Sequence, residues 1–102
     1  MKKISQKYIA EVSIYPPNKL SNGYAYLFKF KVNKETDTYS ALDAIVHLDN
    51  QKTLSSSKPR QIDITSSLKL EDSGPISIGD RFSIYDDGKI GIGRIVEILE
   101  QE

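Results

Sequence analysis

Apolar and polar side chains alternate with a period of two along most of the chain, and Pro, Gly, Asn and Ser separate the alternating segments. This pattern is typical of β-strands that bury one face, and no window shows a sustained helical period. Pro16 and Pro17 end the first segment because proline donates no backbone hydrogen bond. The pattern predicts six strands, at about residues 8–15, 24–32, 39–48, 62–70, 81–85 and 90–99.

The second segment has the clearest alternation. One face is aromatic and aliphatic throughout, with Tyr24, Tyr26, Phe28, Phe30 and Val32. We expect Lys29, Lys31 and Lys34 to form the solvated face of this strand. The third segment alternates less clearly, which predicts a bulge or bend near Asp43.

Two connections differ in length and character. Residues 49–59 are polar and rich in strand-breaking residues, which predicts a loop longer than a usual hairpin connection. Asp86-Asp87-Gly88-Lys89 instead predicts a tight turn between the last two strands, in which Gly88 can take a positive φ. The last two strands therefore form a hairpin.

An antiparallel set of six strands must close or pack on itself to protect its edges. The predicted fold is all-β: a single domain, residues 1–102, forming a small closed antiparallel barrel of six or seven strands, with a small sandwich as the alternative. The predicted core brings together large apolar residues from several strands: Val12, Phe28, Phe30, Ile64, Phe82 and Ile84.

Composition narrows the possible chemistry. The chain has no Cys, which excludes disulfides, thiolate catalysis and zinc sites built on sulfur, and which suits a reducing cytoplasm. No apolar run has the length of a signal peptide or a membrane span, so we expect a cytoplasmic protein that does not enter a membrane. The formal net charge is zero, but residues 1–34 hold seven lysines against the single acidic residue Glu11.

The final hairpin carries a resemblance to a known family. An Arg-Phe-Ser-Ile strand, an acidic turn with glycine and a Gly-Ile-Gly strand that ends in Ile-Leu are similar to the end of the third domain of bacterial elongation factor Tu. The matching positions are Arg81, Phe82, Ile84, Gly88, Gly91, Gly93, Ile98 and Leu99. The opening strand around 8–12 also resembles that of the domain, so the likeness covers about a third of the chain, at its two ends.

The resemblance implies a rigid barrel that binds through its surface. In the family this domain holds one arm of transfer RNA and docks protein partners. Two features depart from the family: the last turn is shorter, and Ser57-Lys58-Pro59-Arg60 stands where a Pro-Gly-Asp turn is expected. No phosphate-binding Gly-x-x-x-x-Gly-Lys-Ser/Thr loop occurs, so we expect neither nucleotide binding nor nucleotide hydrolysis.

Several short patterns suggest chemistry but fit structural roles better. Gly91-Ile92-Gly93 lies within a strand and lacks a third Gly, which favours close packing at a barrel corner over a nucleotide loop. His47, the only histidine, has no partner for a metal site. Asp86 and Asp87 are neighbours in an exposed turn, which favours a turn role over acid and base catalysis. We therefore predict no catalytic residue, no metal and no cofactor.

The predicted binding residues lie on the final hairpin: Arg81, Tyr85, Lys89, Gly91, Gly93 and Arg94. Basic and aromatic side chains of this kind bind phosphate, a stacked base or an acidic protein surface. Cross-strand pairing with Asp80, Asp86 or Glu97 explains the arginines almost as well. The sequence favours a protein partner over transfer RNA; the alternative is a small regulatory or immunity-type protein that blocks its partner, and an enzyme is the least favoured reading.

Overall fold

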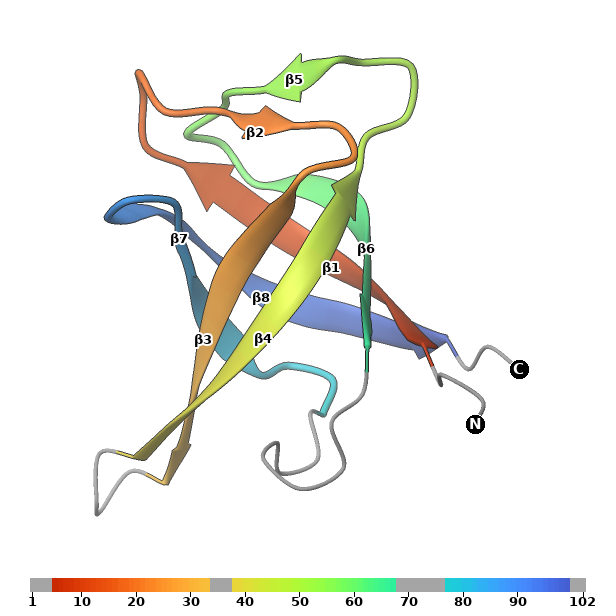
Figure 1. The fold of residues 1–102 in the computed structure, drawn as a ribbon, viewed down its shortest axis with the longest axis vertical. Coiled ribbons are helices and arrows are strands. Elements are labelled where there is room, and N and C mark those ends of the chain that lie inside the picture. Colours follow the sequence, from red (N-terminus) through yellow and green to blue (C-terminus); the bar gives the residue numbers. More distant parts are fainter. Residues whose placement is uncertain (1–4, 34–37, 68–76, 100–102) are drawn as a thin grey trace.

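The computed structural model describes residues 5–33, 38–67 and 77–99 as an all-β barrel (Figure 1). Six strands close into an antiparallel barrel in the order β1-β6-β4-β3-β7-β8, and two short strands, β2 and β5, form a separate sheet. The barrel strands are β1 (Ser5–Ile14), β3 (Ala25–Asn33), β4 (Thr38–His47), β6 (Arg60–Ser67), β7 (Arg81–Tyr85) and β8 (Lys89–Leu99). The short strands are β2 (Leu20–Ser21) and β5 (Thr53–Leu54).

The predicted closed antiparallel barrel is confirmed, with three corrections of detail. β5 lies inside the segment expected to be a loop, and β2 was not predicted at all. The predicted bulge near Asp43 is wrong, because the pairing of β4 with β3 runs without interruption from Ala25↔Ile45 to Lys31↔Tyr39. Of the predicted fourth strand, Leu68 and Leu70 lie outside the described residues.

The predicted core is confirmed, and aromatic rings fill its centre. All six predicted core residues are buried. The rings of Phe28 and Phe82 stack with centroids 4.5 Å apart, and Phe30 is tilted against Phe82 at 5.2 Å. Phe28 and Phe82 come from neighbouring strands, β3 and β7, so the stack also fixes these strands against each other.

Gly91 and Gly93 leave room for this packing. Each occupies an inward-facing position of β8, where Gly93 pairs with Phe82 on one side and Val12 on the other. A Cβ at residue 93 would lie 2.6 Å from Cζ of Phe82 and 2.7 Å from the backbone oxygen of Glu11. A Cβ at residue 91 would collide with the Ser13 carbonyl and lie 2.9 Å from Ile14 Cδ1. The glycines thus serve close packing in the barrel wall, as the strand context predicts.

Tyr8 brings a hydroxyl group into this apolar interior. It lies on β1 in line with Ala10 and Val12, and all three side chains are buried. Burial raises the pKa of the Tyr8 phenol above its ordinary value, because removal from water disfavours the phenolate. The Tyr8 phenol therefore stays uncharged up to a more alkaline pH than an exposed tyrosine would.

The two ends of the barrel are built differently (Figure 1). The sheet of β2 and β5 lies across one end, where it pairs Leu20 with Leu54 and Ser21 with Thr53. β1 begins and β8 ends at the opposite end, side by side, since Lys7 pairs with Leu99. We call the β2–β5 sheet together with residues 48–52 the roof.

Candidate binding surfaces

The outer face of the final hairpin carries most of the predicted binding residues. Arg81 of β7 lies directly opposite Arg94 of β8, and Ser83 lies opposite Ile92 in the next outward-facing row. Both arginines are exposed, and Ile92 retains 43% of its surface exposed. We call the outward-facing residues of this region the hairpin face: Lys29, Arg81, Ser83, Tyr85, Lys89, Ile92 and Arg94.

Arg94 is paired with an acid that was not among the predicted partners. Its Nε lies 3.3 Å from Oε1 of Glu11, on the neighbouring strand β1. Glu11 and Arg94 face each other because closure of the barrel places the first strand beside the last. The predicted pairings with Asp80, Asp86 or Glu97 are therefore replaced at Arg94 by this ion pair. A shallow groove of about 200 Å³ runs beside the pair, lined by Glu11, Ser13, Pro59, Arg81, Ile92, Gly93 and Arg94.

Tyr85 contributes to the hairpin face through a contact with a lysine. The ammonium nitrogen of Lys29, on β3, lies 4.6 Å from the centre of the Tyr85 ring. This is a cation–π distance, so Lys29 covers one face of the ring. Lys89 is the partner of Tyr85 at the start of β8. The structure thus places Lys29, Tyr85 and Lys89 in one part of the outer surface, at the turn end of the hairpin.

The predicted site residues do not all reach this surface. Gly91 is buried in the wall, whereas Gly93 contributes its backbone to the shallow groove. The turn is built by Asp87 and Gly88, which both have positive φ, and the Asp86 amide donates to the Gly88 carbonyl at 2.9 Å. Both aspartates are exposed, as expected for turn residues.

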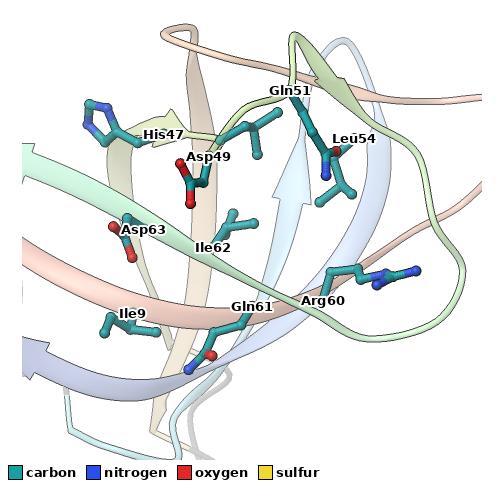
Figure 2. Close-up of a pocket in the computed structure, with 10 residues that line it drawn as sticks. Ile9, His47, Asp49, Gln51, Leu54, Arg60, Gln61, Ile62 and Asp63 are labelled. Carbon is teal, nitrogen blue, oxygen red and sulfur yellow. The ribbon is translucent and has the colours of Figure 1, made fainter.

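A second and larger groove lies below the roof, beside β6 (Figure 2). It has a volume of about 750 Å³, which lies within the range of small-ligand sites. β4 and β6 are paired only from Ala44↔Ser66 to His47↔Asp63, and the groove begins where this pairing ends. The lining residues are Ile9, His47, Leu48, Asp49, Gln51, Leu54, Arg60, Gln61, Ile62 and Asp63.

Residues 48–52 of the roof are hydrogen-bonded to Asn22, which directly follows β2. The Leu48 amide donates to Oδ1 of Asn22 at 2.8 Å, and the Asn22 amide donates to the Lys52 carbonyl at 2.9 Å. Leu48 and Leu54 also pack against the core. The hydrogen bonds order the roof and the two leucines fix it to the barrel, so the groove is present without a ligand.

The polar groups of the roof groove belong to several elements. His47, at the end of β4, is exposed, and its Nε2 lies 2.9 Å from Oγ1 of Thr65. Oδ2 of Asp63 lies 3.5 Å from Nζ of Lys7 on β1. Figure 2 shows Asp49 and Asp63 toward one side of the opening and Arg60 toward the other. The sequence signalled this region only as a long polar loop, which is where binding residues often lie.

Comparison of the sequence with known proteins identifies no family for this chain. No protein-family model matches the chain, and no curated protein matches it. Within residues 5–33, 38–67 and 77–99, no three His, Asp or Glu side chains are grouped to hold a metal ion. The same residues form no helix that is long and apolar enough to cross a bilayer.

Proposed function

We propose that this chain is a non-catalytic binding module that binds an acidic surface of a partner protein through the hairpin face. One observation carries the proposal: Arg81 and Arg94 stand opposite each other on neighbouring strands, next to the exposed Ile92. Glu11 balances the charge of Arg94 from β1, but Arg81 adds a second like charge in direct register, and like charges in register destabilise a sheet. An acidic partner surface supplies the carboxylates that a pair of arginines binds well.

The composition of the hairpin face favours protein over RNA. Protein interfaces commonly have an apolar centre and are enriched in arginine. The hairpin face has both features, since two arginines lie near the partly exposed Ile92. Tyr85, the aromatic side chain on which a base would stack, has one ring face covered by Lys29. The chain has a formal net charge of zero, whereas a dedicated RNA-binding domain is usually strongly basic.

The resemblance to the third domain of elongation factor Tu supports the proposal, since that domain docks partners on its surface. A barrel is the architecture that the resemblance implies. Many unrelated families share such barrels, so membership in the elongation factor Tu family stays a prediction. If binding at this face blocks the activity of the partner, the chain is a regulatory or immunity-type protein.

The test identifies the partner and then changes the hairpin face. Proteins recovered from the source cell with the immobilised chain are purified singly and titrated against it by calorimetry. Arg81→Ala and Lys89→Ala should each weaken binding of the true partner about fivefold or more, because each removes a charged contact. Lys52→Ala is the matched control, since Lys52 is an exposed cation of the roof.

The same variants are titrated with total transfer RNA over a salt series. Submicromolar binding at physiological salt that Arg81→Ala and Lys89→Ala both weaken would assign the hairpin face to RNA and refute the protein partner. A protein partner that binds both variants as tightly as the parent would show that a different surface is used.

A further inference from the structure

We infer that the roof groove binds an extended peptide segment of a partner protein that carries a basic side chain next to an apolar one. This inference concerns a different surface from the hairpin face and does not depend on it. It rests on an open strand edge, on the preformed space above that edge and on the distribution of charge around it.

The open edge is the beginning of β6. Arg60, Gln61 and Ile62 pair with Val12, Glu11 and Ala10 of β1 along one edge of the strand. Along the other edge, β4 pairs with β6 only as far as Asp63. Among the described residues, the β4-facing backbone of Arg60–Ile62 therefore has no strand beside it. An extended peptide can add to such an edge through main-chain hydrogen bonds.

The space above this edge suits a short strand. Residues of the roof and of the β6 edge line the same groove, whose volume of about 750 Å³ is large enough for several residues. Successive side chains of a strand point to opposite faces. One side chain of the bound segment would therefore meet the apolar lining of Leu48, Leu54 and Ile62, and its neighbours would point outward.

The outward neighbours would meet carboxylates. Asp49 is exposed, and Asp63 keeps 46% of its side chain exposed although it already contacts Lys7. Figure 2 shows both acids toward the same side of the opening, beside His47. Lys7 already contacts Asp63 from β1, and Arg60 lines the opposite side of the groove, so Asp49 is the main carboxylate that a basic side chain would meet. A Lys or Arg side chain of the bound segment is thus complementary to this side of the groove.

The experiment uses a library of random heptapeptides displayed on phage and selected against the full-length chain. The expected result is enrichment of peptides in which Lys or Arg directly precedes or follows Leu, Ile, Val or Phe. One enriched peptide, made synthetically, is then titrated against variants. Asp49→Asn should weaken its binding about tenfold, because it removes one charge partner without shortening the side chain.

Matched controls separate the two binding surfaces. Asp43→Asn removes an exposed carboxylate from the outer face of β4 away from the groove and should leave the affinity unchanged. Arg81→Ala should also leave it unchanged, whereas it weakens the partner of the hairpin face. Amide NMR shifts on peptide addition should be largest at Gln61, Ile62 and Asp63. Thermal melting of Asp49→Asn checks that the roof is intact.

Three outcomes would overturn the inference. The first is enrichment of acidic peptides, or of none over the starting library. The second is peptide binding that a folded Asp49→Asn variant retains in full. The third is a set of NMR shifts centred on β7 and β8, which would place the peptide on the hairpin face.

Discussion

Two walls of the barrel are built in opposite ways. One wall consists of β1, β8 and β7, and the other consists of β4 and β6. In the first wall, Gly91 and Gly93 let neighbouring backbones and the Phe82 ring approach closely, and the strands pair along nearly their full lengths. In the second wall, pairing ends at His47↔Asp63 and the strands separate below the roof. The comparison shows that closure is carried by the aromatic and glycine packing of one side, which leaves the other side free to hold an open groove.

The largest expected effect comes from removing the ring at the centre of the close-packed wall. Phe82→Ala should lower the free energy of unfolding by about 3–5 kcal/mol, since it deletes a buried aromatic side chain and leaves a cavity between Phe28 and Phe30. Urea unfolding followed by circular dichroism measures the change. A midpoint equal to that of the parent would mean that this wall does not hold the barrel closed.

A smaller effect is expected from adding one methyl group to the same wall. Gly93→Ala should destabilise the barrel by about 1–3 kcal/mol, because the new Cβ would overlap the Phe82 ring and the Glu11 backbone. The neighbouring outward position gives the control: Ser83→Ala should change stability by less than about 0.5 kcal/mol. Equal effects of the two substitutions would contradict the close approach seen at Gly93.

The smallest effect is expected at the open wall. Leu54→Ala should cost about 1–2 kcal/mol, since Leu54 is only partly buried between the roof and the core. Amide hydrogen exchange should accelerate in β2 and β5 while the amides of β3 and β7 remain protected, because the roof opens locally. Thr53→Ala, at the exposed neighbouring position, should change neither. Uniform acceleration through all strands would show that the two walls unfold as one unit.

The close-packed wall could largely be predicted from sequence. Alternation along the second segment correctly predicts the burial of Tyr26, Phe28 and Phe30, whereas Tyr24, expected on the same face, precedes β3 and is 66% exposed. The Asp86–Gly88 turn predicts the hairpin whose Phe82 stacks on Phe28. The interpretation of Gly91 and Gly93 as packing positions also follows from their place within a strand. These signals are local, so a single strand and its turn are enough to give them.

The rest depends on residues far apart in the chain. The Glu11–Arg94 ion pair joins the first strand to the last, and only the register of the closed barrel shows that these residues meet. β2 and β5 are two residues each, too short for alternation to be visible. The roof groove exists because the pairing of β4 with β6 stops at one residue pair, and hydrophobic periodicity does not report where a ladder ends.

The open edge of β6 also bears on how the protein avoids polymerising. Exposed strand edges are templates on which identical chains can stack into fibrils. Here the free edge is bounded at one end by the His47↔Asp63 pair and at the other by Pro59, whose backbone offers no donor to an incoming strand. An added strand therefore finds partners only along Arg60, Gln61 and Ile62. An edge of that length can hold a short guest peptide but is too short to seed the growth of a continuous intermolecular sheet.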